Sequence, residues 1–114
     1  MSEHKISQVQ DSIARAREQL EQGKALERLR KSRDFQLIIE KGYLVQEAVR
    51  LVHLKASEHM AAPDKQASVL KQIDGIGCLA SYFSTINFLA SNAERSIAED
   101  EETLEYLLKS PEGE

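Results

Sequence analysis

The sequence contains one cysteine, two prolines and no tryptophan, and aromatic residues make up only 5% of it. A single cysteine excludes a disulfide within the chain and is typical of proteins made in a reducing cytosol. No window approaches 18 uncharged apolar residues, and the first five residues lack the apolar segment of a signal peptide. We therefore expect a soluble protein that does not enter a membrane and is located in the cytoplasm.

The composition favours helices over sheets. Charged residues account for 30% of the 114 positions, and Ala, Leu, Glu, Lys, Gln and Arg dominate. A chain of this length is typical of one domain. We predict an all-α fold in which residues 1–109 form a single helical domain and residues 110–114 form a disordered tail.

The N-terminal region has the spacing of a coiled-coil helix. Its apolar residues recur at alternating intervals of three and four positions, which places them on one seam that needs a partner helix. The next position in the series is Gly23, so we expect a break, a bend or a change of packing partner there. The residues of this seam are Ile6, Val9, Ile13, Ala16 and Leu20.

The region 63–108 predicts one extended helix, or two nearly in line. Pro63 suits its first turn, no proline follows within it, and at about 1.5 Å per residue it spans on the order of 65 Å. This helix and the N-terminal helix predict an elongated antiparallel helical hairpin. Its expected apolar line runs through Val69 or Leu70, Ile73, Ile76, Ala80, Phe83, Leu89 or Ala90, Ala93 and Ile97.

Two short helices are expected to close one end of this hairpin. Ser32 suits the cap of the first, which should end at Gly42. This helix should be buried on most of its circumference, because four of five successive positions are apolar: Phe35, Leu37, Ile38 and Ile39. The second should present a broad apolar face. Together these helices leave more apolar surface than one chain covers, which predicts a homodimer or higher oligomer. The broad face consists of Val45, Ala48, Val49, Leu51, Val52 and Leu54.

Charge is distributed unevenly, with eleven Lys or Arg against eight Asp or Glu in residues 1–55 and four against eleven in residues 56–114. The halves can therefore attract each other, and Lys5, Arg15 and Arg17 can offset the C-terminal carboxylates. Three clusters are candidate interaction surfaces: a basic one for nucleic acid, a polar one, and an acidic helix that mimics a charged ligand and inhibits a host defence or regulatory protein. A pI near 5.4 argues against nucleic acid. The clusters are Arg28, Arg30, Lys31 and Arg33; Tyr43, Arg50 and His53; and Glu99, Asp100, Glu101 and Glu102.

The residues that usually carry chemistry are scattered. His4, His53 and His59 lack the spacing of a metal clamp, and Cys78 is expected to be a small buried hydrophobe. The glycines form no phosphate-binding motif, and the carboxylates occupy ordinary helix-surface positions. The sequence therefore predicts a protein that is not an enzyme, with no cofactor, no metal and no small-molecule substrate, and that acts by binding protein.

One stretch resembles a known group of proteins. It runs from Asp34-Phe35-Gln36 through Gly42-Tyr43-Leu44 to Glu47-Ala48-Val49-Arg50-Leu51-Val52, followed by Gln66-Ala67-Ser68. This pattern, which covers roughly residues 25–82, is similar to that of small helical proteins encoded by tailed bacteriophages, some of them among head and tail genes. The resemblance implies a virion, assembly or host-interaction role in the host cell cytoplasm or the virion. It carries no functional residue over to this chain.

Overall fold

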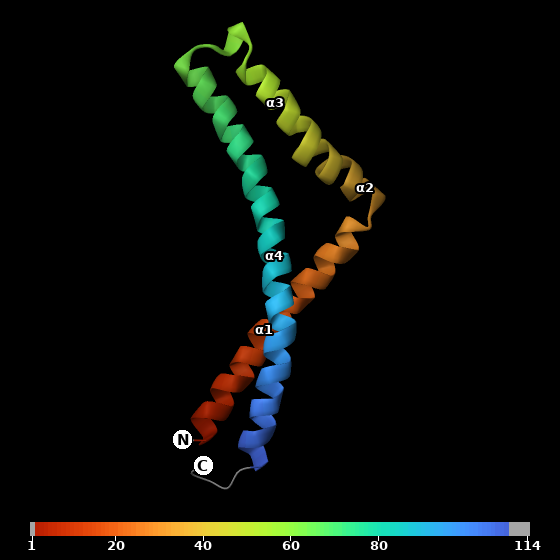
Figure 1. Cartoon of the computed structure of the whole chain (residues 1–114), viewed down its shortest axis with the longest axis vertical. Coiled ribbons are helices and arrows are strands. Elements are labelled where there is room, and N and C mark those ends of the chain that lie inside the picture. Colours follow the sequence, from red (N-terminus) through yellow and green to blue (C-terminus); the bar gives the residue numbers. More distant parts are fainter. Residues whose placement is uncertain (1, 110–114) are drawn as a thin grey trace. The chain divides into compact units, whose positions relative to one another are not determined.

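The computed structural model describes residues 2–109, which are 94% helical and contain no strand (Figure 1). The long helices lie at the two ends of the chain, so the predicted all-α fold with long N- and C-terminal helices is confirmed. The tail expected at 110–114 lies outside the described residues. In chain order the elements are α1 (Ser2–Arg30), α2 (Arg33–Phe35), the π-helix η1 (Gln36–Glu47), α3 (Ala48–Lys55), the 3₁₀ turn η2 (Glu58–Met60) and α4 (Pro63–Lys109).

The chain divides into two compact units. Unit 1 combines the described residues up to Leu26 of α1 with those from Thr85 onward in α4. Unit 2 is the continuous segment Glu27–Ser84, which contains the end of α1, the short helices and the first part of α4. Both long helices therefore supply residues to both units.

In unit 1, α1 and α4 run antiparallel and pack along the predicted seam (Figure 1). Ile13 and Ala16 are buried on α1 and Ala93 is buried on α4, while Ile6, Val9 and Leu20 are half-buried. The alternation of three and four residues keeps these side chains on one side of each helix, as in a coiled coil.

Gly23 allows the two helices of unit 1 to approach closely. Helix α1 continues through Gly23 to Arg30, so the glycine does not end it. A Cβ atom built at Gly23 would overlap Cβ of Ala90 on α4. Of the three outcomes expected at Gly23, a break in the helix is therefore wrong, and the glycine brings two backbones together.

A charged side chain, Asp100, lies in the seam of unit 1. Asp100 is half-buried, and its Oδ2 accepts a hydrogen bond of 2.6 Å from the Ser12 hydroxyl on α1. The Ser96 hydroxyl lies 3.5 Å from the same oxygen. A hydrogen-bonded polar residue among apolar seam positions favours one pairing of the helices over shifted ones.

The core of unit 2 forms between α3 and α4. Leu51 and Val69 are almost fully buried together with Ile76, and Tyr43, Leu44, Ala48, Leu54, Met60 and Ile73 pack around them. The apolar line of α4 is confirmed with Val69 rather than Leu70. It is wrong at Ala80, which is exposed, because Leu79 is the half-buried residue between Ile76 and Phe83.

Side chains from the first turn of α4 hold the turn between α3 and α4, since Lys65 Nζ lies 3.3 Å from the His59 carbonyl oxygen and Gln66 makes two further bonds. Helix α4 begins at Pro63 as predicted. The Gln66 amide nitrogen donates hydrogen bonds to the carbonyl oxygens of Lys55, at 2.8 Å, and of Met60, at 2.6 Å. These bonds satisfy carbonyl groups at the end of α3 and in η2 that have no helical partner.

The expected stop at Gly42 is wrong. Segments α2, η1 and α3 follow one another without a gap, so residues 33–55 form one continuous helix, here called the middle helix (Figure 1). Gly42 lies inside its π-helical part, where a Cβ would approach the Leu37 carbonyl oxygen to 2.9 Å. A left-handed glycine is not needed, because the chain widens its turns here instead of ending the helix.

Candidate protein-interaction surface

The middle helix carries two parallel rows of apolar side chains. A single partner helix, α4, covers one of these rows. Leu44, Ala48 and Leu51 follow a spacing of four and three residues and pack on α4 in unit 2. Val45, Val49 and Val52 repeat that spacing one position later and remain outside the core. The broad apolar face expected from the sequence is therefore split into a buried row and an exposed row.

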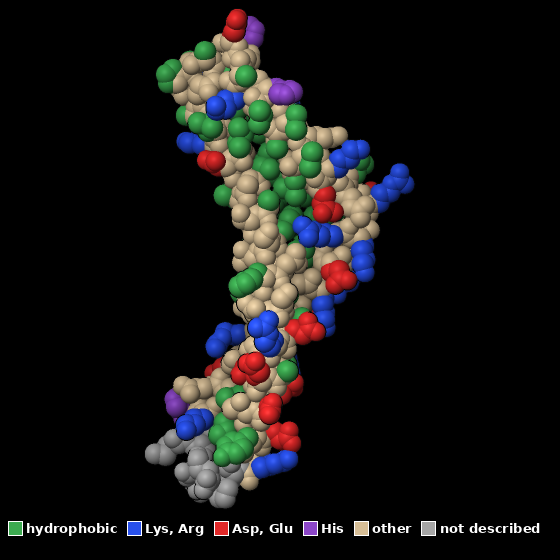
Figure 2. All heavy atoms as spheres, in the orientation of Figure 1, with side chains coloured by type: hydrophobic (Ala, Val, Ile, Leu, Met, Phe, Trp, Pro, Cys, Tyr) green, Lys and Arg blue, Asp and Glu red, His purple; other side chains and the backbone are tan. Residues whose placement is uncertain are grey.

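The exposed row continues toward the start of the middle helix. Leu37 and Ile38, expected to be buried, are 56% and 64% exposed, and the three valines are 51–56% exposed. Figure 2 shows hydrophobic side chains gathered over the short helices and the adjacent part of α4, with Lys and Arg side chains beside them. We call the set Leu37, Ile38, Val45, Val49 and Val52 the apolar stripe.

The π-helical geometry explains why Leu37 and Val45 both face outward. A π-helix bonds each N–H to the carbonyl five residues earlier, so each turn contains more than four residues. Positions four apart, such as Leu37, Lys41 and Val45, then stay close to one side. The sequence predicts burial of Leu37 and Ile38 because four of the five positions 35–39 are apolar, and this count does not show how many partner helices are present to cover them.

Among the basic candidates, Arg30 has a structural role. Its guanidinium lies 5.6 Å from the centre of the Phe83 ring, and its Nε is 3.4 Å from Oε2 of Glu40. Phe35 packs against the same Phe83 ring, with 5.8 Å between the ring centres. This cluster connects the end of α1, the middle helix and α4 within unit 2.

The other basic candidates lie on the surface near the turn between α1 and α2. Lys31 forms an exposed ion pair of 3.5 Å with Glu27, and Arg28 and Arg33 are exposed. The Ser32 hydroxyl accepts a hydrogen bond from the Phe35 N–H, which confirms Ser32 as a helix cap.

The residues of the predicted polar cluster lie in different environments. Tyr43 packs against the core of unit 2, where its hydroxyl would lie 3.6 Å from a Cβ at Gly75. Arg50 donates two hydrogen bonds, of 2.7 and 2.8 Å, to the Glu47 carboxylate on its own helix. His53 is exposed.

The contact between Arg50 and Glu47 predicts a titration effect. The hydrogen bond from Arg50 lowers the pKa of the Glu47 carboxyl group below its ordinary value, and the nearby charge adds to this effect. A lowered pKa contributes stability at pH values above the unfolded pKa, and this contribution is lost as the pH falls through the folded pKa. Arg50→Gln should therefore raise the pKa of Glu47, as measured by NMR titration of its side-chain carboxyl carbon. An unchanged midpoint would contradict the role of Arg50.

The acidic cluster is divided between structure and surface. Asp100 lies in the seam, and Glu101 forms an ion pair of 3.2 Å with Arg17. Arg17 is one of the three basic residues expected to offset the charge of the C-terminal carboxylates. Glu99 and Glu102 are exposed and, with Thr103 and Tyr106, line a depression of about 380 Å³ on α4.

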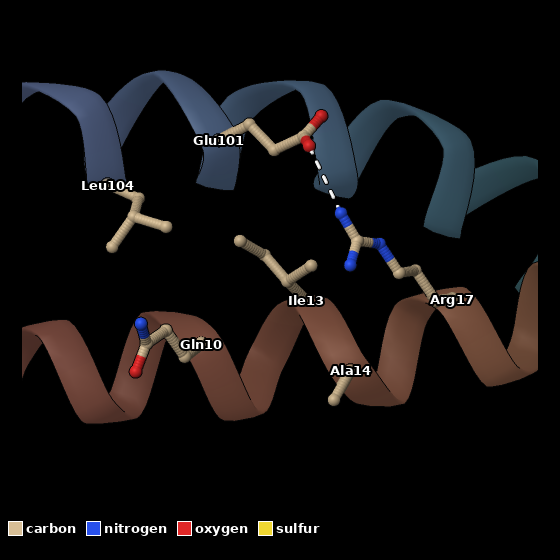
Figure 3. A pocket seen from close by; sticks show the side chains of 6 residues that line it. All are labelled: Gln10, Ile13, Ala14, Arg17, Glu101 and Leu104. Atoms are coloured by element: carbon tan, nitrogen blue, oxygen red, sulfur yellow. Dashed lines mark hydrogen bonds and ion pairs between the residues drawn. The ribbon is translucent and has the colours of Figure 1, made fainter.

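A second depression, of about 250 Å³, lies between the helices of unit 1. Figure 3 shows Ile13 and Leu104 facing each other beside the ion pair of Arg17 and Glu101, with Gln10 and Ala14 completing the lining. Pockets that enclose drug-sized ligands have volumes of about 300–1,000 Å³. This depression is therefore small, and its charged side chains already bind each other.

Cys78 is exposed on α4, so its expected burial is wrong. It falls between the inward positions Ile76 and Leu79, on the side of the helix that faces away from the core. Among residues 2–109, no group of His, Cys, Asp and Glu side chains is arranged to hold a metal ion. None of the described helices has a segment both long and apolar enough to cross a lipid bilayer.

Comparisons with protein-family models, with curated proteins and with solved structures gave no significant match.

Proposed function

We propose that this chain is a non-enzymatic helical protein that binds other protein molecules through the apolar stripe. The observation that supports the proposal is the exposure of five large aliphatic side chains, each more than half exposed, along one helix. Fully burying such a side chain is worth about 1.5–3 kcal/mol, so a partner that covers the stripe gains substantial free energy. Contiguous exposed apolar surface commonly marks a protein interface.

The residue types of the stripe support the same function. Ile38 and the three valines are β-branched, and such residues are less favourable in a helix than Ala by up to about 0.7 kcal/mol each. At positions open to solvent, a polar residue with higher helix propensity would serve the fold better. A requirement to pack against a partner would account for the β-branched residues at these exposed positions.

The resemblance of residues 25–82 to small helical proteins of tailed bacteriophages supports a biological context for this binding role. We propose a structural, assembly or host-interaction role of that type, carried out in the host cell cytoplasm or the virion. Proteomics of purified phage particles would separate a virion component from a protein that acts only inside the host.

Site-specific photo-crosslinking tests the binding role. A benzoylphenylalanine placed at Val45, in the middle of the stripe, should yield a crosslinked protein adduct when the producing cells are irradiated. The matched control carries the same residue at Gln46, an adjacent exposed position outside the stripe, and should yield little adduct. Equal or absent adducts at the two positions would contradict the proposal, and an adduct that contains nucleic acid would favour a regulator of nucleic acid.

A further inference from the structure

The middle helix changes its winding along its length. Helix η1 holds 12 residues of π-helix, whereas π-helix usually occurs as single turns, frequently at functional sites. An α-helix has 3.6 residues per turn, so positions four apart rotate by about 40° around it at each step. The wider turns of η1 keep such positions closer to one side. The half-buried residues that recur every four positions here are Phe35, Ile39, Tyr43 and Glu47.

This winding decides which apolar side chains at the start of the middle helix are covered. Phe35 lies against Phe83, with 5.8 Å between the ring centres, and Ile39 is half-buried one turn later. Leu37, between them in the sequence, is 56% exposed. The π-helical winding therefore covers Phe35 and Ile39 and leaves Leu37 open to solvent.

An α-helical winding of the same residues would exchange these side chains. Two α-helical turns contain about seven residues, and Leu37, Leu44 and Leu51 are spaced by seven. With α-helical turns throughout, Leu37 would lie on the side of the buried Leu51. Phe35, two positions earlier, would lie about 200° away around the axis and would turn away from Phe83. Each winding thus offers an apolar side chain to the core.

Gly42 distinguishes between the two windings. A π-helix bonds each N–H to the carbonyl five residues earlier, which brings the Leu37 carbonyl to Gly42. A Cβ built at Gly42 lies 2.9 Å from that oxygen, closer than a real Cβ ordinarily approaches. In an α-helix the N–H at this position would bond the Ile38 carbonyl instead, and alanine is the residue that best suits such a helix.

We propose that the middle helix can adopt both windings and that Gly42 selects the π-helical one. Gly42 thereby holds Phe35 against Phe83 and places Leu37 in the apolar stripe. In the α-helical form Leu37 leaves the stripe, and Phe35 and Ile39 become exposed.

Thiol labelling can distinguish the two windings. The natural Cys78 is exposed, so the measurements use a Cys78→Ser background. A single cysteine replaces either Leu37 or Ile39, and its rate of reaction with N-ethylmaleimide reports its exposure. With Gly42 present, Leu37→Cys should react quickly and Ile39→Cys slowly. Adding Gly42→Ala should reverse this order and change each rate by about tenfold or more.

Two further variants separate rewinding from a general loss of structure. Gly77→Ala is the matched control, since it makes the same replacement in a helix at a site where no atom lies within 4 Å of the added Cβ. This control should leave both labelling rates unchanged. Phe35→Ala removes the ring that the π-helical winding places against Phe83 and leaves Gly42 in place. It should shift the two rates in the same direction as Gly42→Ala.

NMR observes the hydrogen bonds themselves. A scalar coupling across the hydrogen bond should connect the amide at position 42 to the Leu37 carbonyl in the wild type and to the Ile38 carbonyl in Gly42→Ala. A coupling to Ile38 in the wild type would overturn the proposal. Unchanged labelling rates in Gly42→Ala and Phe35→Ala would show a single winding, and fast reaction at both cysteines would show lost packing; either result overturns it. If Gly42→Ala fails to fold, the rates in Phe35→Ala decide: their reversal supports the second winding, and their persistence overturns it.

Discussion

Replacing Phe83 with Ala is expected to lower the free energy of unfolding by about 3–5 kcal/mol, the range for truncating a buried Phe. Phe83 is 8% exposed and contacts both the Phe35 ring and the Arg30 guanidinium. Its removal leaves a cavity between the end of α1, the middle helix and α4, and it deprives Arg30 of the ring beneath it. Urea denaturation followed by circular dichroism gives the change directly.

Phe88→Ala is the matched control, since Phe88 is the same residue type on the same helix but is 65% exposed. At a protein concentration low enough to prevent association, this change should alter the unfolding free energy by no more than about 0.5 kcal/mol. Equal losses for the two variants, or no loss for Phe83→Ala, would show that Phe83 is not part of the core.

Gly23→Ala and Gly77→Ala are expected to change stability in opposite directions. Alanine normally stabilises a helix interior by about 1 kcal/mol relative to glycine. At Gly77 no atom lies within 4 Å of the added Cβ, so the gain should be realised. At Gly23 the added Cβ would overlap Ala90, and such overpacking costs typically about 1–3 kcal/mol.

A compensating change tests whether the contact with Ala90 is the cause. Ala90→Gly combined with Gly23→Ala moves the methyl group from α4 to α1 and should recover part of the stability lost by Gly23→Ala alone. Thermal unfolding of the two single variants and the pair provides a double-mutant cycle. A stabilising effect of Gly23→Ala would contradict the close approach of the helices.

The seam of unit 1 could be predicted from the sequence because its spacing is a property of the helix alone. Ile13, Ala16 and Ala93 recur at the intervals of an a/d pattern, and all three are buried. The same logic found Ile76 and Phe83 on α4. Where the chain keeps α-helical turns and one partner, periodicity is sufficient information.

The surface of the middle helix could not be predicted in the same way. Leu37, Ile38 and the exposed valines are as apolar as the buried Leu44 and Leu51, and composition does not say which row faces the core. The deciding factors are the number of available partner helices and the wider turns of η1, neither of which is encoded in local spacing. The repeated intervals of Leu44, Ala48, Leu51 and Val45, Val49, Val52 were the signal for two rows.

The acidic region shows a further limit of reasoning from residue type. From residue type alone, the four successive carboxylates from Glu99 to Glu102 predict one solvated patch. Helical rotation turns them in different directions, so that Asp100 enters the seam, Glu101 meets Arg17, and Glu99 and Glu102 face outward. Four carboxylates that are adjacent in the sequence therefore lie in three different environments in the structure.

The two units differ in chain continuity, since unit 2 is one segment and unit 1 joins two distant segments, and this difference predicts an order of folding. Unit 2 is one continuous segment, so its contacts close short loops, whereas unit 1 joins residues as distant as Ser12 and Asp100, which are 88 positions apart. Local contacts form early because they lose less chain entropy on closure. During synthesis, residues 27–84 can collapse while the partner of the N-terminal helix has not yet left the ribosome. We therefore expect unit 1 to form after unit 2, as α1 and α4 extend toward the two chain ends.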